Sequence, residues 1–593
     1  MTRHIVPLYF GPEDSLFGVL NPVDGPARRG VLICAPIGYE NVIYHRQLAV
    51  LARRIAQKGA PTFRFDWPGC GDSAGDDDDP ELVTEALASI DAAARVLAEH
   101  AGVEAVDVVG LRFGATLLGC APPTGGGDIV LWDAFSSGKA YLRSLRAFER
   151  LSGSRSKDTS RESAAGFLLT RETIAAIEEL DVLGGDLGSP RRVLLAHRDG
   201  ASVADLADHL TAVGHDVTTL ALDGLREVAL GWAERPVPIS SFAAIESWLG
   251  LPADAAAAAS SNGNGGVSRF SRAGSLQLAG GVVEQPVLLT DGSPMLGIVD
   301  TPPSYSSDGP SLDGSWVVFV PNRYARRIGP NRLYSRWARR WAHRGLPSFR
   351  VDVNGTGDAG GPDGETDRDM YQRDGVDDVL RSLAFLREEF GGERAAIIGL
   401  CSGGYLGFHA ALADPMVADV ILLNPQMLLW ADHETSVTRA TAIRSRVFRP
   451  RSWSRFMRNP ITWLRFVLPV LREVVVTDLS WRLGRRSESA GGPPSTDAVE
   501  EWIRSSIKAL GDRGCRLHFV FSEGDSGIGY LTRYLGAELV GLVDQPNVTF
   551  HVIEGANHSF TDLGSQDALH DLIASTLTSA GYGQLSTPAG VSE

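Results

Sequence analysis

The chain has 593 residues, which is too long for one compact hydrophobic core and predicts about two to four domains. Hydrophobic residues make up 44% and charged residues 22%, as in globular proteins, and no apolar run is long enough for a transmembrane helix. The net charge of −16 argues against a protein that binds nucleic acid over its whole surface.

The five cysteines are scattered without paired spacing, and the N-terminal stretch has no apolar signal-peptide region. We therefore expect a cytoplasmic protein without a disulfide framework, without a zinc or other metal site and without a cofactor. The sequence leaves the oligomeric state open.

In chain order, the first half contains three segments that return in the second half. "LYFGPEDSLFGVLNP" (8–22) resembles "VLLTDGSPMLGIVDTP" (287–302), and "APTFRFDWPGCGDSAG" (60–75) resembles "LPSFRVDVNGTGDAGG" (346–361). "VDVVGLRFGATLLG" (106–119) resembles "AAIIGLCSGGYLGF" (395–408). The offset is 286 residues at the second pair, measured from Phe63 to Phe349. The repeat predicts two tandem copies of one fold.

Between the copies lies a stretch rich in Ala, Ser, Gly and Asn, which cannot bury a core. This composition predicts a first domain over 1–252, a flexible linker over 253–280 and a second domain over 281–593.

The second copy alternates short apolar runs with amphipathic stretches. The apolar runs predict strands at 316–321, 348–353, 395–400, 418–424, 516–522 and 548–554, and a helix is expected over 368–390. Near-continuous apolar strands separated by helices are typical of a mostly parallel sheet covered on both faces. The predicted fold class is therefore doubly wound α/β, with a hairpin-like strand pair at the start of each copy.

Each copy contains a glycine-flanked turn between a strand and a helix, "GLRFG" (110–114) and "GLCSG" (399–403). Such a turn directs its central side chain outward at the carboxyl edge of a sheet. With these motifs the chain resembles two α/β-hydrolase domains. "GPNRLYSRWARRWAHRGLPSFRVDVNGTGD" (329–358) and "GLRFGA" (110–115) resemble the exosortase-system-associated, serine-aminopeptidase-like hydrolases. The cysteine elbow is similar to that of the dienelactone hydrolases.

The resemblance implies the order nucleophile, acid, histidine. Cys401 stands at the apex of the second turn, Asp525 follows the predicted strand 516–522, and His558 follows the strand 548–554. We expect these three residues to form a Cys-His-Asp triad. One alternative is that Cys401 is a buried structural cysteine. The other is that Ser402 is the nucleophile, but the alignment of the two copies opposes it, because Cys401 then occupies the apex position that Arg112 has in the first copy. The backbone N–H of Ser402 is then expected in the oxyanion hole.

The second oxyanion donor is expected in the loop after strand 316–321, at Asn322 or Arg323. His409, His518 and His551 are interpreted as structural. Asp352 and Asp358 are interpreted as turn and loop-capping residues.

The first copy has Arg112 at the apex of its turn, and an arginine cannot act as a nucleophile. Asp199 stands where Asp525 does, and Glu227 stands where His558 does. The first copy is therefore predicted to be catalytically degenerate. Arg112 is expected either to bind an anionic group or to form an ion pair with Asp199 or Glu227.

A larger lid is predicted in the second copy, at about 425–500. Residues 439–486 contain twelve arginines and two acidic residues, interleaved with aromatic and aliphatic side chains. A solvated basic face is the simple explanation. An apolar tunnel with an anion-attracting rim is the functional one, and it suits acyl groups carried by coenzyme A or an acyl-carrier protein. Docking to a membrane surface is a further alternative.

These features together lead to the hypothesis of an acyl-processing enzyme, a thioesterase, esterase or acyltransferase, that works through an acyl-cysteine intermediate on an ester or acyl-thioester substrate. The resemblance to exosortase-associated proteins implies a biosynthetic setting. The alternatives are a dienelactone-hydrolase-like enzyme that cleaves small esters or lactones, and a non-catalytic binding scaffold.

Overall fold

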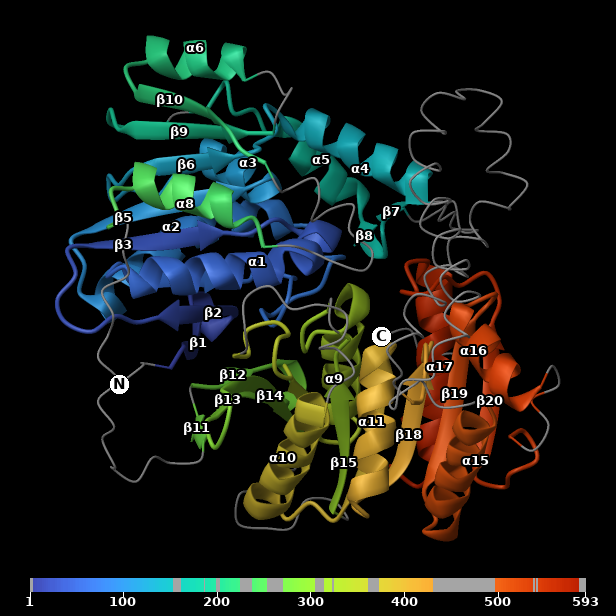
Figure 1. Ribbon diagram of the computed structural model, residues 1–593. Coiled ribbons are helices and arrows are strands. Elements are labelled where there is room, and N and C mark those ends of the chain that lie inside the picture. Colours follow the sequence, from blue (N-terminus) through green and yellow to red (C-terminus); the bar gives the residue numbers. More distant parts are fainter. Residues whose placement is uncertain are drawn as a thin grey trace, which may run out of the picture.

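In the computed structural model the description covers residues 4–152, 162–185, 187–198, 203–223, 237–252, 270–272, 274–303, 305, 314–322, 325–360, 373–429, 496–536, 539 and 542–585. These residues form two large sheets, one from each half of the chain, and helices flank both sheets (Figure 1). The predicted α/β fold class, with mostly parallel sheets and interleaved helices, is confirmed, and the two sheets fit the predicted division into two domains.

The first sheet has eight strands in the order β1-β2-β4-β3-β5-β6-β9-β10. Strands β1 and β2 run antiparallel to their neighbours, and the strands from β4 onward are parallel. The strand bounds are β1 Val6–Phe10, β2 Leu16–Asn21, β3 Arg29–Cys34, β4 Thr62–Phe65, β5 Ala105–Leu111, β6 Ile129–Trp132, β9 Arg192–His197 and β10 Asp216–Ala221. A separate hairpin comprises β7 Glu162–Ala164 and β8 Phe167–Leu169.

The second sheet repeats this order as β13-β14-β16-β15-β17-β18-β19-β20, again with the first two strands antiparallel to their neighbours. Its strand bounds are β13 Val283–Leu289, β14 Met295–Thr301, β15 Ser315–Val320, β16 Ser348–Val351, β17 Arg394–Leu400, β18 Val417–Leu423, β19 Arg516–Ser522 and β20 Val548–Ile553. The six strands predicted in this copy are thus present within a few residues of the expected limits. The identical strand order shows that the internal repeat extends to topology.

The helices follow the strands in alternation. In the first domain they are α1 Gly38–Gln57, α2 Leu82–Ala101, α3 Phe113–Cys120, α4 Gly138–Ser152, α5 Arg171–Glu179, α6 Ala204–Ala212 and α8 Ile239–Trp248. In the second domain they are α9 Leu333–Ala342, α10 Arg373–Phe390, α11 Ser402–Ala413, α15 Thr496–Asp512, α16 Ser526–Leu535 and α17 Leu563–Ser579.

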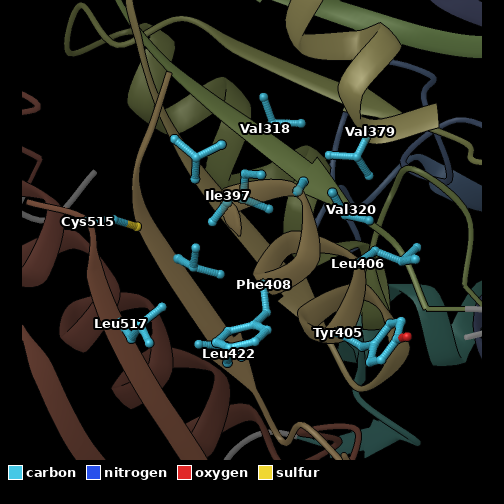
Figure 2. Packing of buried hydrophobic residues seen from close by; sticks show 14 of the residues in the cluster. Val318, Val320, Val379, Ile397, Tyr405, Leu406, Phe408, Leu422, Cys515 and Leu517 are labelled. Carbon is cyan, nitrogen blue, oxygen red and sulfur yellow. The ribbon is translucent and has the colours of Figure 1, made fainter. Parts of the chain in front are cut away.

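Strand β15 shows why the central strands are mostly apolar. Its residues are all buried, and successive side chains enter the hydrophobic clusters on opposite faces of the sheet. Val318 and Val320 lie in one cluster with Phe408 of α11, whereas Val317 and Phe319 lie in the other. Figure 2 shows the first cluster, in which residues of α11 lie against the sheet. A strand that is covered on both faces is therefore a near-continuous run of apolar residues.

The linker prediction needs a correction at its C-terminal end. Residues Phe270–Arg272 form β11 and Leu276–Gln277 form β12, and both pair antiparallel with β13. Phe270 packs edge-on against Phe385, and Leu276 is almost fully buried, so each short strand is held by one apolar side chain and by its pairing with β13, which the Gly- and Ser-rich composition does not reveal. Residues 253–269 lie outside the described residues.

The two domains meet through the first strands of each sheet. Tyr9, Phe17 and Val19 of the first domain share one buried hydrophobic cluster with Leu288 and Leu296 of the second. Because apolar burial is the dominant favourable contribution to such contacts, this cluster helps to hold the domains together.

Candidate active site

Cys401 lies at the apex of a sharp turn between β17 and α11. Its backbone dihedrals are φ 55° and ψ −114°, a region that costs a non-glycine residue about 1–3 kcal/mol. The N–H of Cys401 donates a 2.8 Å hydrogen bond to the carbonyl of Leu423, the last residue of β18. The turn thereby leaves the Cys401 side chain at the carboxyl edge of the sheet, partly exposed.

The glycines around Cys401 are required by close backbone packing. A Cβ atom on Gly399 would lie 2.2 Å from the carbonyl carbon of Gly403, and one on Gly403 would lie 2.3 Å from the carbonyl oxygen of Val320. Real Cβ contacts do not come so close, so the spacing G-x-C-x-G follows from the geometry of the turn. The same packing brings the end of β15 beside Cys401.

Asp525 and His558 lie in the loops after β19 and β20, and the structure brings them together. The His558 Nδ1 atom lies 2.7 Å from Asp525 Oδ2. The Asp525 carboxylate is buried, with a side-chain exposure of 3%, whereas the His558 side chain is 39% exposed. Asp525 also caps α16, since its Oδ1 accepts a hydrogen bond from the Gly527 N–H. The cap fixes the carboxylate in the orientation that the imidazole uses.

The electrostatic environment of His558 favours its protonated form. Burial alone would lower the pKa, but hydrogen bonds to Asp525 and to Cys401 and the electrostatic interactions with both groups raise the pKa of His558 to about 10. A histidine that interacts with a cysteine on one side and a carboxylate on the other has the connectivity of a thiol–imidazole–carboxylate triad. A neighbouring imidazolium stabilises a thiolate.

Two polar residues after β18 support this arrangement and were missed by the sequence analysis. Gln426 Nε2 donates a 2.7 Å hydrogen bond to Asp525 Oδ1. Asn424 is fully buried, its Nδ2 donates to the His558 carbonyl at 2.9 Å, and its Oδ1 accepts from the Ser522 N–H at 2.7 Å. The signal in the sequence was the polar triplet "NPQ" directly after an apolar strand, where parallel strands present functional groups.

Of the oxyanion-hole residues expected from the sequence, Ser402 and Asn322 lie among the described residues. Ser402 is the first residue of α11 and is only 2% exposed, so its hydroxyl is less accessible than the Cys401 thiol. Asn322 follows β15, where Val320 is paired with Gly399 of β17. The Asn322 side chain accepts a 2.8 Å hydrogen bond from the Ala325 N–H. Arg323 lies outside the described residues.

The remaining histidines of this domain that were interpreted as structural have other partners or environments. His409 contacts the Leu428 carbonyl at 2.9 Å and stacks on Trp502. His518 is buried against Asp419 at 3.2 Å. His551 lies on β20, and burial lowers its pKa.

The corresponding turn of the first domain has the same backbone but a different side chain. Arg112 has φ 56° and ψ −122°. Its guanidinium donates to Glu40 Oε1 at 2.7 and 3.0 Å and to Asp133 Oδ2 at 2.7 Å, and it lies over the Phe135 ring. Burial lowers the Arg112 pKa, but the two carboxylates more than offset this effect and raise it.

These contacts revise the expectation for Arg112. Its described ion-pair partners are Glu40, at the start of α1, and Asp133, directly after β6, two acidic residues that the sequence analysis did not name. Asp199 and Glu227 both lie outside the described residues. Because Glu40 and Asp133 already neutralise the cation, Arg112 does not present an uncompensated positive charge to an anionic ligand.

The predicted lid at about 425–500 lies outside the described residues, apart from its first five residues and the start of α15. Within the part of the chain that the structure describes, no helix combines the length and apolarity needed to cross a membrane. Among the same residues, no group of three or more His, Cys, Asp or Glu side chains is arranged to hold a metal ion.

The sheet order and the strand–turn–helix motif at Cys401 define an α/β-hydrolase fold. Residues 317–464 match the family model described as "Serine aminopeptidase, S33". The family name refers to serine, whereas this chain has a cysteine at the apex of the turn. No curated protein sequence matches the chain at a significant level.

Solved structures of α/β hydrolases resemble about half of the chain. An alpha-beta serine hydrolase homologue from Coxiella burnetii is 13% identical, covering 49% of this chain and 96% of its own, with a TM-score of 0.28. A proline iminopeptidase from Mycobacterium smegmatis is 15% identical, with coverages of 50% and 98% and a TM-score of 0.29. An esterase from Pyrococcus furiosus is 13% identical, with coverages of 50% and 92% and a TM-score of 0.33.

Proposed function

We propose that the chain is an acyl-processing enzyme, a thioesterase, esterase or acyltransferase, in which Cys401 forms a covalent acyl intermediate. The observation that carries the proposal is the 2.7 Å contact between His558 and Asp525, combined with the interaction of His558 with the cysteine at a strained turn. Structural cysteines do not need such a turn, an imidazole partner and a capped carboxylate at the same sheet edge.

In the proposed reaction, the Cys401 thiolate attacks the acyl carbonyl carbon of an ester or thioester. The oxyanion is stabilised by the N–H groups of Ser402 and the loop at Asn322. Collapse of the tetrahedral intermediate breaks the bond to the leaving group, which takes a proton from the His558 imidazolium. Water or another acceptor molecule then attacks the carbonyl carbon of the thioester and gives its proton to His558. The bond to sulfur breaks, and Cys401 leaves as the thiolate.

A cysteine nucleophile supports transfer as well as hydrolysis. The intermediate is a thioester, similar in energy to an acyl-thioester donor and more reactive toward amines than an oxyester. Coenzyme A or an acyl-carrier protein as the acyl donor belongs to the same proposal, on the basis of the arginine content between 439 and 486. In the same proposal, the first domain is degenerate, because Arg112 occupies the place of the nucleophile.

The direct test is intact-mass analysis after incubation with butyryl-coenzyme A and with p-nitrophenyl butyrate. We expect a butyryl adduct on the wild type and none on Cys401→Ala, with release of free coenzyme A or p-nitrophenolate. A wild type without an adduct, or an adduct that persists in Cys401→Ala, would contradict the proposal. A panel of lactones separates a dienelactone-hydrolase-like activity from thioester chemistry.

A non-catalytic scaffold makes a different prediction for the same residue. If both domains only bind partners, iodoacetamide should alkylate Cys401 at pH 7 no faster than it alkylates an unactivated thiol. The proposed enzyme should instead show faster alkylation, and the rate should fall in His558→Ala.

A further inference from the structure

The interface between the domains contains a buried ionic network with an approximate two-fold relation. Arg64 of the first domain donates to Asp358 of the second at 2.7 Å, and Arg350 of the second domain donates to Asp72 of the first. The members of each matching pair, Arg64 with Arg350 and Asp72 with Asp358, are 286 residues apart, which is the offset of the internal repeat. The repeated motifs therefore face each other across the interface.

The network departs from this symmetry in the loop between β15 and α9. Arg326 donates two hydrogen bonds to Asp66 of the first domain, at 2.6 and 3.0 Å. Its counterpart one repeat earlier is Glu40, which instead binds Arg112. Arg327 lies 2.8 Å from Asp72 of the first domain. Arg326 and Arg327 of this loop therefore both contact carboxylates of the first domain. Arg327 also donates to Asp352 and Asp358 of its own domain, at 2.6 and 2.9 Å.

Arg332, at the end of the same loop, binds the first domain through backbone carbonyl groups and not mainly through carboxylates. Its guanidinium donates to four carbonyl oxygens of the first domain, those of Gly69, Gly71, Ser73 and Gly75, at 2.6 to 2.9 Å. Arg326, Arg327 and Arg332 are all at most 3% exposed. Buried ion pairs contribute little net stability, but they can fix one arrangement of the groups that they join.

This loop begins at Asn322, the predicted second side of the oxyanion hole. Asn322 Oδ1 accepts a hydrogen bond from the Ala325 N–H at 2.8 Å. Arg326, which follows Ala325 in the chain, donates two hydrogen bonds to Asp66. A short chain of contacts thus joins a carboxylate of the first domain to the strand end beside Cys401. Oxyanion donors act over about 2.7–3.1 Å, so a displacement of about 1 Å weakens them strongly.

The loop that carries His558 is also held from the first domain. The carbonyl of Gly166, in the turn of the β7–β8 hairpin, accepts a 3.0 Å hydrogen bond from Gln566 Nε2, which also donates to the Phe560 carbonyl. Asn331, from the loop after β15, donates to the carbonyls of Ser559 and Phe560 at 2.9 and 3.0 Å. Both loops beside Cys401 therefore have contacts that lead to the first domain.

We infer that the N-terminal domain positions the active site of the C-terminal domain, with Asp66 as a positioning residue that holds the oxyanion loop through Arg326. This inference rests on the proposed acyl chemistry at Cys401. It assigns the first domain a role in the reaction that does not require any chemistry at Arg112.

The experiment uses the full chain, p-nitrophenyl butyrate as the acyl donor and iodoacetamide as an alkylating probe. Alkylation of Cys401 reports on the thiol and on His558 but forms no oxyanion. We expect Asp66→Asn to lower kcat by about 10- to 100-fold with KM within threefold, and to leave the alkylation rate within twofold of wild type. Asparagine keeps an oxygen that can still accept from the Asp72 N–H, a bond of 3.0 Å in the structure.

Tyr9→Phe is the matched control. It removes a 3.1 Å bond to Glu284 between the same two domains without touching either loop beside Cys401. Its kcat should remain within twofold of wild type. An unchanged kcat in Asp66→Asn, or an equal fall of kcat and alkylation rate, would overturn the inference.

A double variant separates positioning from stability. Asp66→Asn alone removes the nearest anionic partner of the buried Arg326 cation and leaves Asp72 at 4.0 Å, which destabilises the fold, whereas Asp66→Asn with Arg326→Met removes both charges. We expect the double variant to recover the melting temperature but not kcat. Recovery of kcat together with the melting temperature would overturn the inference. If wild type reacts with iodoacetamide but forms no acyl adduct, the proposed function itself fails.

Discussion

Replacing Asp525 by asparagine tests the triad with little change in shape. In the structure, Asp525 Oδ1 accepts hydrogen bonds from Gln426 and from the Gly527 N–H, while Oδ2 faces His558. In the variant, those two donors hold the amide oxygen in the Oδ1 position. The amide NH₂ group then faces His558 Nδ1 and can only donate to it. The imidazole is therefore forced into the tautomer with its proton on Nε2.

Two losses set the magnitude of the effect. The charge-assisted bond of 2.7 Å is replaced by a neutral one, and hydrogen bonds to charged groups contribute about 1.5–3 kcal/mol, or roughly 10- to 100-fold in rate. The wrong tautomer also prevents Nε2 from accepting a proton from the attacking group. By analogy with carboxylate-to-amide changes in Ser-His-Asp enzymes, we expect kcat/KM to fall by about 10³-fold or more.

The assay is release of p-nitrophenolate from p-nitrophenyl butyrate, combined with alkylation of Cys401 by iodoacetamide at pH 7. Both rates should fall in Asp525→Asn, because the carboxylate also supports the imidazolium. Glu523→Gln is the matched control, since Glu523 lies in the same loop and accepts a hydrogen bond from the Gly555 N–H. Activity of Asp525→Asn within threefold of wild type would refute the assignment of Asp525 as the triad acid.

Three further predictions concern other parts of the chain. Gly403→Ala should lower the melting temperature by several degrees, because its Cβ would meet a backbone carbonyl at 2.3 Å, whereas Gly529→Ala, with open space around it, should not destabilise. Burial lowers the pKa of His45 to about 4, so the unfolded chain takes up this proton first. The contribution of neutral His45 to the free energy of unfolding is therefore complete above pH 6.5 and is lost as the pH falls toward 4. Urea unfolding should therefore show that the free energy of unfolding falls between pH 7 and pH 5 by about 2 kcal/mol less in His45→Gln than in wild type. Equal decreases in the two proteins would contradict a lowered pKa of His45. Arg112→Ala should cost about 2–3 kcal/mol, because Glu40 loses the guanidinium that binds it and Asp133 loses one of its two arginine partners, while Arg198 remains 2.8 Å away. Its initial rate with p-nitrophenyl butyrate, at a temperature where it remains folded, should stay within threefold of wild type, and a larger loss would contradict a structural role.

The sequence was informative wherever the backbone dictates residue types. Apolar runs at 395–400 and 516–522 predicted buried parallel strands, because such strands are covered on both faces. The spacing of Gly399 and Gly403 around Cys401 predicted a strand–turn–helix motif, because only glycine tolerates the contacts found there. The internal repeat fixed the register of this turn by placing Arg112 opposite Cys401.

The sequence was uninformative wherever one side chain selects among several partners that are distant in the chain. Asn424 and Gln426 hold the His558 and Asp525 loops; their position directly after an apolar strand indicates the edge of the sheet, but it does not identify the residues that they contact. Arg112 could pair with any acidic residue near the edge of its sheet, and the fold brings Glu40 and Asp133 to it.

The sequence alone therefore determined the fold class, the duplication and the candidate nucleophile, because periodicity and glycine spacing are local consequences of backbone geometry. Only the tertiary structure decided how the two copies face each other. Arg326 and Asp66 are 260 residues apart, and nothing in the local pattern around either residue names the other. Their contact is fixed by the packing of the two domains, which buries both charges and places them 2.6 Å apart.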